Sequence, residues 1–467
     1  MSCTLVIDQG THASRALIYS ARGEPVDGVE ESVGLVQTGH ERVEQDPRQL
    51  LDSVHGAAAR LLARNPGCVR QAALATQRST VLAWRKNDGR PLSPALSWQD
   101  RRASDDLRRF RSQEPEIRRI TGLPLSPHYG AGKLRWLLRQ DPGVRQALET
   151  NNLCLGPLVS YLLAHLLPGR RHLTDHSNAH RTLLFDIERL AWSEELLELF
   201  DIPPQCLPRP LPLRGEWGLL DEYDIPLKAV CGDQNAALYA QGPLPEKTAA
   251  INLGTGAFIL MPCDAAGAAS TPLLRGIAMS NGGACRYLVE GTVNGAGAAL
   301  SWVQRQWPVD GLFGKLDDWL HDIQSPPLFI NTVGGLGSPW WKTGGRPRFT
   351  GRRPIQKAAR HVAVIESIVF LLQHNIERLR QLQAVARLHV SGGLSRLDGL
   401  CQRLADLSGL EVARIADPEA TARGAAWLAA GCPEDWKAQQ PEKIFRPRQA
   451  PGLERRYGRF TREIEGT

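Results

Sequence analysis

The sequence predicts an α/β protein built from two domains. The chain has 467 residues, too many for one hydrophobic core and enough for two or three. Short apolar runs alternate with longer segments whose apolar residues recur at helical spacing, a pattern typical of α/β folds with a largely buried sheet. One strand–turn–strand segment occurs twice, as TLVIDQGTHASRALIYS at residues 4–20 and as AINLGTGAFILM at residues 250–261. We therefore expect one copy in each domain.

The first half of the chain supplies predicted strands, helices and one irregular connection. Short apolar runs bounded by turn residues predict strands at 4–8, 14–20, 72–77, 80–84 and 226–233. Helical spacing predicts helices at 47–64 and 130–149. Residues 153–169 are the most apolar segment, and we expect a buried helix there because the segment is short for a membrane span. The proline-dense residues 202–222 predict a loop-rich connection.

The second half repeats this alternation after a short PLPEKT linker at residues 243–248. Strands are expected within 250–261 and at 387–393 and 411–416, and helices at 361–383, 395–409 and 419–431. Beyond residue 435 the chain becomes polar and predicts a surface tail or a last docked helix. The linker places the expected boundary between an N-terminal domain, 1–241, and a C-terminal domain, 242–467.

Composition excludes several classes of protein. The net charge of +7 comes mainly from arginines scattered over amphipathic helices, which predicts solvated faces with a weak attraction for phosphate-bearing ligands and gives no support for nucleic-acid binding. The nine cysteines include no C-x-x-C pair, which argues against a zinc site or a disulfide framework. No signal peptide or membrane span is visible, so we expect a cytoplasmic protein that does not bind membranes.

The repeated Gly-Thr segment is the first candidate site. Taken alone, each copy fits an ordinary hairpin turn. Two copies favour a phosphate clamp, because such a turn presents backbone N–H groups and a threonine hydroxyl to phosphate oxygens. Only one metal-holding acid is needed, which would account for Asp8 before the first turn and Asn252 before the second.

The segment VCGDQNAALYA at residues 230–240 carries the second candidate. An apolar strand running into a small-residue helix places Asp233 at the carboxyl end of that strand, where open α/β sheets bind ligands. Asp233 could be a general base for a hydroxyl group or a helix N-cap that needs no substrate.

Two further segments, TQRSTVLAW at 76–84 and SPALSWQDRR at 93–102, predict another pair of strands. Arg78 offers a rigid fork to hydroxyl groups, and Trp98 offers an apolar wall to the C–H face of a polyol. The alternative is a structural ion pair between Arg78 and Asp100 beneath a packed indole.

The order of these motifs resembles the FGGY family of carbohydrate kinases, and within it the glycerol kinase branch. The resemblance runs nearly end to end. The matching motifs are DQGTxxSR at 8–15, QRST at 77–80, SWQDRR at 97–102, TDHSNAHRTLLFDI from residue 174, GDQNAAL at 232–238, NLGTGAF at 252–258, EGTVNGAGAALSW at 290–302, GLGSPWW from 335, SGGLSR at 391–396 and EATARGAA at 419–426.

The resemblance implies two actin-like (ribonuclease H-like) domains with ATP and a small sugar or polyol in the cleft between them. It implies ATP-dependent phosphorylation of a hydroxyl group, with Mg²⁺ held by Asp8 and with Asp233 as the base. The implied acceptor contacts are Gln77, Arg78, Trp98, His128 and Gln234. The implied phosphate and nucleoside contacts are Gln9, Gly10, Thr11, Arg15, Gly254, Thr255, Gly297, Gly392 and Gly393. A homodimer or homotetramer is also expected.

Five positions depart from the glycerol kinase pattern. Ser79 stands in place of a glutamate and His128 in place of a tyrosine, so the acceptor is either a small polyol such as glycerol or a larger tetritol or pentulose. His12 replaces a threonine, while Ser391 and Leu397 replace an Asp and an Asn, which implies weaker or less adenine-selective nucleotide binding. A catalytically weak regulatory homologue is a further alternative. An actin-like chaperone or filament would explain the doubled loop but not the Gln-Arg and Trp-Gln-Asp segments.

Overall fold

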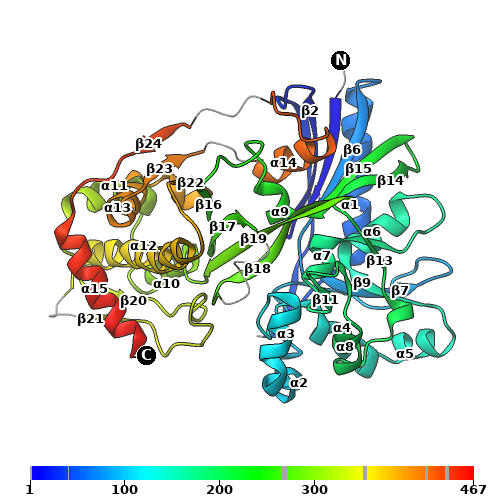
Figure 1. The fold of residues 1–467 in the computed structure, drawn as a ribbon, viewed down its shortest axis with the longest axis horizontal. Helices are drawn as coiled ribbons and strands as arrows, with labels where there is room; N and C mark the ends of the chain where they lie inside the picture. The colour runs from blue at the N-terminus through cyan, green and yellow to red at the C-terminus, as the bar shows by residue number, and fades with distance from the viewer. Residues whose placement is uncertain are drawn as a thin grey trace. The chain divides into compact units, whose positions relative to one another are not determined.

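A computed structural model describes residues 3–39, 41–264, 271–350, 355–415, 419–436 and 441–466. The chain forms two compact units, and each is a layered α/β structure (Figure 1). Unit 1 comprises residues 1–243, 276–287 and 419–438, and unit 2 comprises 244–275, 288–418 and 439–467. The predicted α/β class is confirmed. Because the chain crosses between units several times, the units are defined by packing, and the domain boundary between residues 241 and 242 stays a prediction.

The main sheet of unit 1 is centred on three parallel strands, β1, β6 and β15, with antiparallel strands on both sides. The apolar faces of these strands join a core that contains Leu5, Ile7, Leu74 and Val230. The strand order is β14 (Arg214–Leu220), β15 (Ile225–Gly232), β6 (Val69–Thr76), β1 (Cys3–Gln9), β2 (Ala13–Ser20) and β3 (Pro25–Ser32).

A second sheet of unit 1 carries the segments that were predicted to hold the acceptor. Its order is β4 (Val36–Thr38), β5 (Arg42–Gln45), β8 (Ala95–Leu96), β7 (Val81–Arg85) and β9 (Leu153–Pro157). Two short ladders pair β10 (Leu173–Asp175) with β13 (Arg209–Leu211) and β11 (Phe185–Asp186) with β12 (Ala191–Trp192). The helices are α1 (Pro47–Arg64), α2 (Ser104–Leu107), α3 (Glu114–Thr121), α4 (Gly130–Gln140), α5 (Pro142–Glu149), α6 (Leu158–Leu166), α7 (His176–His180), α8 (Glu194–Leu199), α9 (Asp233–Ala237) and α14 (Ala420–Ala429).

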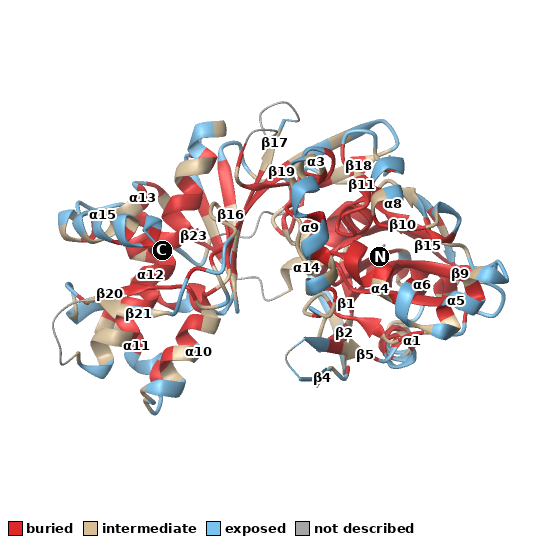
Figure 2. Ribbon diagram, turned by 90° about the horizontal axis from the view of Figure 1, so that it is seen from below, coloured by how far each residue is buried: buried red, intermediate tan, exposed pale blue. Residues whose placement is uncertain are grey.

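Unit 2 is built around the long helix α12 (Lys357–Leu382), which is buried throughout from His361 to Ile376 and is drawn largely in the buried colour in Figure 2. This helix packs against β17, α10, α11 and α13. The strands are β16 (Thr248–Leu253), β17 (Ala257–Cys263), β19 (Ala284–Val293), β20 (Leu328–Ile330), β21 (Arg348–Thr350), β22 (Arg387–Ser391), β23 (Glu411–Arg414) and β24 (Lys443–Phe445), with β18 (Leu274–Asn281) and β19 passing between the units in sequence. The other helices are α10 (Gly297–Gln306), α11 (Leu312–Asp322), α13 (Asp398–Ser408) and α15 (Pro451–Glu465).

The two units repeat one strand pattern. In unit 1 the hairpin β1–β2 is antiparallel, and β1 then pairs in parallel with β6 and β6 with β15. In unit 2 the hairpin β16–β17 is antiparallel, and β16 pairs in parallel with β22 and β22 with β23. The two Gly-Thr segments of the sequence are therefore the equivalent first hairpins of two similar sheets.

Three predicted elements differ from the structure. The helix expected at 130–149 is two helices, because Asp141 ends α4 and its side chain accepts hydrogen bonds from the Gly143 and Val144 N–H groups at the start of α5, with Pro142 as the first helical residue. The buried helix expected at 153–169 begins as strand β9 and becomes α6 only at Leu158. The loop-rich segment 202–222 contains strands β13 and β14.

The polar end of the chain is a docked helix rather than a free tail. Leu453, Phe460 and Ile464 of α15 are buried in the core of unit 2, which decides between the two predicted alternatives. Residue 416 of the predicted strand and residues 437–440 of the predicted tail lie outside the described residues. Within the described ranges, no helix combines the length and apolar character needed to cross a bilayer.

Helix α14 comes from the C-terminal half of the sequence but packs in unit 1, against β1, β6, β15 and α9. Its contact with α9 is made backbone to backbone at Gly424, where a Cβ atom would lie 1.8 Å from the Ala236 carbonyl oxygen. Only glycine permits this approach, so the closeness of α14 to the first turn of α9 depends on that residue.

We expect Gly424→Ala to lower the free energy of unfolding by about 3 kcal/mol, because the added methyl group must push α14 away from α9. The matched control is Gly458→Ala in the middle of α15, where nothing lies within 4 Å of the added methyl group. The control should gain about 0.5–1 kcal/mol from higher helix propensity. Urea unfolding followed by circular dichroism measures both, and equal stability of the two variants would contradict the packing argument.

Candidate active site

Asp8 lies at the carboxyl end of β1, immediately before the first Gly-Thr turn. Its hairpin partner is Arg15 on β2, and its parallel partner is Ala75 on β6. The turn is closed by a 2.9 Å hydrogen bond from the Gly10 N–H to the Ala13 carbonyl. Asp8 is only 7% exposed, so its carboxylate is largely withdrawn from water.

Asp233 lies at the same edge of the sheet. It directly follows β15, which is separated from β1 only by β6, and it is the first residue of α9. The N-cap position belongs to Gly232, so Asp233 does not occupy the position that the capping alternative requires. Its Oδ1 accepts a 2.7 Å hydrogen bond from the Gln234 N–H, and its side chain is 32% exposed. Asp233 is therefore both held in place and open to a ligand.

The two acids influence one another electrostatically. Burial and then the negative charge of Asp233 raise the pKa of Asp8 to about 7, with a further contribution from Glu419 and an opposing one from Arg15. The Arg15 Nε lies 2.6 Å from a carboxylate oxygen of Glu30 and 4.0 Å from one of Glu419. A cation beside Asp8 would restore its charged form, so this acid suits a ligand that brings positive charge.

Arg78 packs next to Asp233. Its Nη1 donates to the Asn235 side-chain oxygen at 3.1 Å, its Nη2 donates to the Gln234 side-chain oxygen, and its Nε lies 3.7 Å from Asp233 Oδ1. The side chain lies against the Gly232 backbone, where a Cβ atom would come within 2.6 Å of it. The structure thus gathers the predicted base, Asp233, and two predicted acceptor contacts, Arg78 and Gln234, at one edge of the sheet.

Asp100 has a different role from the ion pair with Arg78 considered above. Its carboxylate accepts hydrogen bonds from Arg102 at 2.8–3.0 Å and from the Val43 N–H at 2.8 Å, and it is fully buried. Asp100 therefore anchors β5 to the segment that follows β8.

Two predicted ligand contacts, Gln9 and Gln77, are buried beneath the first turn. The Gln77 side-chain amide donates to Gln9 at 3.1 Å and to Gln45 at 2.9 Å, and the Gln45 amide donates to the Thr11 carbonyl at 2.9 Å. Gln9 and Gln77 are at most 2% exposed. Their placement makes them supports of the turn, while direct contact with a ligand stays a prediction.

Trp98 and His128 form an aromatic wall beside the turn. The Trp98 indole N–H donates to the Thr11 hydroxyl at 3.0 Å, and the Trp98 and His128 rings meet edge to face with centroids 5.6 Å apart. Burial, and then the charge of Lys133, lower the pKa of His128 well below its usual value, so this imidazole is neutral near pH 7. A neutral wall of this kind suits the C–H face of a polyol.

The second Gly-Thr turn lines a pocket of about 340 Å³ within unit 2. Its walls are the turn itself, the start of α10 and the residues after β22, and they include Gly254, Thr255, Gly297 and Gly393. Gly297 is required by close packing, because a Cβ atom there would lie 2.8 Å from the Gly254 carbonyl. Gly392 adopts a φ of 89° and faces the Leu253 backbone, where a Cβ atom would also come within 2.8 Å. Four of the predicted phosphate and nucleoside residues therefore share one pocket.

Leu397, one of the unusual residues near this pocket, is 2% exposed and belongs to the core of unit 2. It is not among the residues that line the pocket in the part of the chain that the structure describes. Its apolar side chain therefore fills the core rather than the nucleoside wall.

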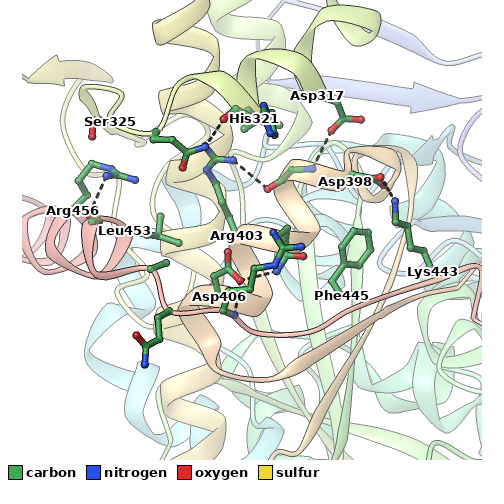
Figure 3. Close-up of a pocket in the computed structure, with 18 of the residues that line it drawn as sticks. Asp317, His321, Ser325, Asp398, Arg403, Asp406, Lys443, Phe445, Leu453 and Arg456 are labelled. Carbon is green, nitrogen blue, oxygen red and sulfur yellow. Dashed lines mark hydrogen bonds and ion pairs between the residues drawn. The ribbon is translucent and has the colours of Figure 1, made fainter.

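A larger pocket of about 650 Å³ lies elsewhere in unit 2, between α11, α13, β24 and the start of α15 (Figure 3). It shares no lining residue with the Gly-Thr pocket. Its charged groups are engaged with one another: Arg456 binds the buried Glu366, Lys443 binds Asp398, and the Asp406 carboxylate accepts the Arg448 N–H. Because these charged groups bind one another, we interpret the pocket as a packing boundary between elements of unit 2 and not as a candidate catalytic site.

The sequence reasoning missed two residues that the structure places at this edge of unit 1. Lys133 is fully buried beside His128, and Glu419 lies next to Arg15. A lysine within the small and apolar stretch GAGKL is a signal that could have identified Lys133, whereas Glu419 reaches the site only through the folding of α14 onto unit 1.

Comparisons with known proteins agree with this geometry. Residues 3–223 match the FGGY family of carbohydrate kinases, N-terminal domain, and residues 249–431 match its C-terminal domain. A glycerol kinase of Citrifermentans bemidjiense is 35% identical over 92% of this chain and 90% of the relative, and one of Thermus brockianus is 35% identical over 91% and 89%.

Solved structures show the same fold. A Plasmodium falciparum glycerol kinase with ADP has a TM-score of 0.90 at 22% identity, covering 100% of this chain and 98% of that one. A Lactobacillus acidophilus xylulose kinase has a TM-score of 0.87 at 20% identity over the same shares. The predicted pair of α/β domains is thereby confirmed.

The raised pKa of Asp8 predicts that ionisation of this side chain lowers the free energy of unfolding. The folded chain binds this proton up to about pH 7 and the unfolded chain only up to about 4, so the carboxylate lowers stability as pH rises between these values. Without divalent metal, Asp8→Asn should therefore stabilise the protein, by an amount that grows from pH 4 to 7 and then levels off at about 4 kcal/mol.

Thermal melts across this pH range measure the effect. The control is Asp27→Asn, because hydrogen bonds from Asn65 and Gly28 lower the pKa of that partly exposed acid, so its stabilising contribution is present at neutral pH and lost as pH falls. At pH 8, Asp8→Asn should thus raise the melting temperature, whereas Asp27→Asn should lower it. An Asp8→Asn variant that is no more stable than wild type at pH 8 would contradict the buried-charge argument.

Proposed function

We propose that this chain, which belongs to the FGGY family of carbohydrate kinases and is an ATP-dependent kinase of a sugar or polyol similar to glycerol kinases, phosphorylates a hydroxyl group of a small polyol or ketose. The reaction takes place at the edge of unit 1 that carries Asp8 and Asp233. The observation that carries this proposal is the position of a partly exposed carboxylate, Asp233, beside Arg78 and the more deeply buried Asp8.

Asp233 is the base. The acceptor oxygen attacks the γ-phosphorus of ATP, the bond from that phosphorus to the leaving ADP oxygen breaks, and the hydroxyl proton passes to the Asp233 carboxylate. Arg78, 3.7 Å away, favours the charged form of Asp233 and offers N–H donors to other hydroxyl groups of the acceptor. The Gln234 N–H fixes the orientation of the carboxylate.

The residues present fit a magnesium ion at Asp8. Mg²⁺ takes one or two carboxylates and completes its shell with water and phosphate oxygens, and the largely buried carboxylate of Asp8 is a ligand of this kind. Bound Mg²⁺ would neutralise charge on the phosphates. Asp8, withdrawn from water, would hold it, and the Thr11 hydroxyl would supply a neutral donor in the turn that follows.

ATP is assigned to the Gly-Thr pocket of unit 2. Gly254 and Thr255 offer a turn to the phosphates, and the lining residues Gly297 and Gly393 have no side chains that would obstruct a ligand. The rim includes Phe313, a ring that is 57% exposed and free to lie against a nucleobase.

The acceptor is either a triol such as glycerol or a longer tetritol or pentulose. Ser79 favours the longer acceptors, because a short side chain stands where the family resemblance leads one to expect a glutamate. The aromatic wall of Trp98 and His128 serves either kind of substrate.

Replacing the base should stop the reaction without removing the nucleotide. We expect Asp233→Asn to lower kcat at least 1000-fold, because the amide cannot accept the proton, while the Kd for ATP stays within twofold. A coupled ADP assay and calorimetry measure the two quantities. The control is Glu216→Gln, an exposed acid on β14, which should keep wild-type kcat. Substantial turnover by Asp233→Asn would refute the assignment of the base.

The acceptor can be identified with a panel of glycerol, tetritols, pentitols and ketopentoses assayed for ATP consumption. We expect turnover of at least one compound, and a preference for four or five carbons if Ser79 widens the site. Ser79→Glu should shift that preference toward glycerol at least tenfold in kcat/KM. Failure of wild type to phosphorylate any member of the panel would count against the proposed function.

A further inference from the structure

Lys133 is a buried cation that the proposed reaction does not use directly. It lies on the first turn of α4, and its side chain is fully buried. Its ammonium group donates to three backbone carbonyls, those of Ser79 at 2.6 Å, Ser97 at 3.0 Å and His128 at 3.0 Å. An ammonium has three N–H donors, so each has one of these acceptors.

The three carbonyls belong to three segments that carry the acceptor site. Ser79 directly follows Arg78, Ser97 directly precedes Trp98, and His128 is itself part of the aromatic wall. These segments lie far apart in sequence, and the ammonium group is a point at which all three are joined. A shift of Lys133 would therefore move the arginine and both rings relative to one another.

One of the three residues bound by Lys133, Ser79, has a strained backbone conformation. Its φ of 65° lies in the left-handed region, which costs a non-glycine residue about 1–2 kcal/mol. Its hydroxyl is buried and has no hydrogen-bond partner among the described residues. The carbonyl of the same residue makes the shortest of the three bonds to Lys133. The conformation of the residue after Arg78 is thus held by a group on α4.

We infer that Lys133 is a positioning residue that fixes the acceptor site by tying the Arg78, Trp98 and His128 segments to one ammonium group. This inference rests on the proposed function, because it assigns these segments to the acceptor.

The charge state of Lys133 supports the inference. Burial, reinforced by Arg101 and Arg102 and opposed by Asp100, lowers the pKa of this lysine to about 7. His128, the other titratable group that faces it, stays neutral here. Below pH 7 the ammonium can donate to all three carbonyls; above it the amine has two N–H groups, so one carbonyl loses its donor. The acceptor KM should therefore rise as pH increases through 7.

The test compares Lys133→Met with Arg135→Met on the same helix. Arg135 is equally buried but binds Asp106, Asp201 and the Phe200 carbonyl instead of acceptor segments. With ATP and the best acceptor from the panel, we expect Lys133→Met to raise the acceptor KM at least tenfold and to leave the ATP KM within twofold. Arg135→Met should lower the melting temperature but leave both KM values within twofold.

Two further readouts separate positioning from general loss of structure. In wild type the acceptor KM should rise several-fold between pH 6 and 8.5 while the ATP KM does not, and Lys133→Met should abolish that dependence. The double variant Lys133→Met/Ser79→Gly should recover part of the lost acceptor affinity, since glycine adopts the left-handed conformation without strain. If Lys133→Met fails to fold, the absence of the wild-type pH dependence would still overturn the inference.

Hydrogen exchange provides a readout that needs no substrate. Amides of residues 77–80, 96–99 and 126–129 should exchange faster in Lys133→Met than in wild type, and at the wild-type rate in Arg135→Met. Unchanged exchange in all three segments, or an unchanged acceptor KM, would refute the positioning role. If wild type phosphorylates no compound of the panel, the proposed function fails, whereas the exchange experiment still decides whether Lys133 holds the segments together.

Discussion

The constraint on which the rest of unit 1 depends is the electrostatic repulsion between two carboxylates at the carboxyl ends of the parallel strands β1 and β15. Asp8 is buried, and the charge of Asp233 makes it harder to ionise. Two arginines partly compensate this negative charge: Arg15 lies next to Asp8, and Arg78 lies next to Asp233. Because Gly232 has no side chain, Arg78 can pack against its backbone. Glu419, at the start of α14, lies 4.0 Å from Arg15 and forms an ion pair with it.

The repeated hairpin has unequal chemistry in the two units. In unit 1 the strand before the turn ends in the buried Asp8, while the corresponding Asn252 of unit 2 is exposed and neutral. The first turn is supported from below by the amides of Gln9, Gln77 and Gln45, whereas the second is backed by the glycine-dependent packing of α10. A shared strand order thus carries a charged site in one copy and an uncharged, glycine-lined pocket in the other.

Short sequence patterns predicted those features of the fold that depend on interactions between residues close together in the chain. The two hairpins and the place of Asp233 at a strand end follow from apolar periodicity and glycine, both visible in short windows. The division of α4 from α5 depends on Asp141 capping the second helix, and an apolar run such as 153–157 fits a strand or a helix equally well. The inward direction of Gln9 and Gln77, the burial of Lys133 and the arrival of Glu419 depend on contacts far apart in sequence, which no local pattern contains.

The membership of α14 in unit 1 has a consequence for biosynthesis. A ribosome releases the chain from the N-terminus, so β1, β6 and β15 all emerge well before the helix that covers them, and even β15 precedes it by about 190 residues. Until residue 429 has left the exit tunnel, the strand ends bearing Asp8 and Asp233 lack Glu419 and the backbone contact at Gly424. Completion of the first unit therefore waits for translation of α14, and a nascent chain that stops short of this helix cannot display the finished pair of acids.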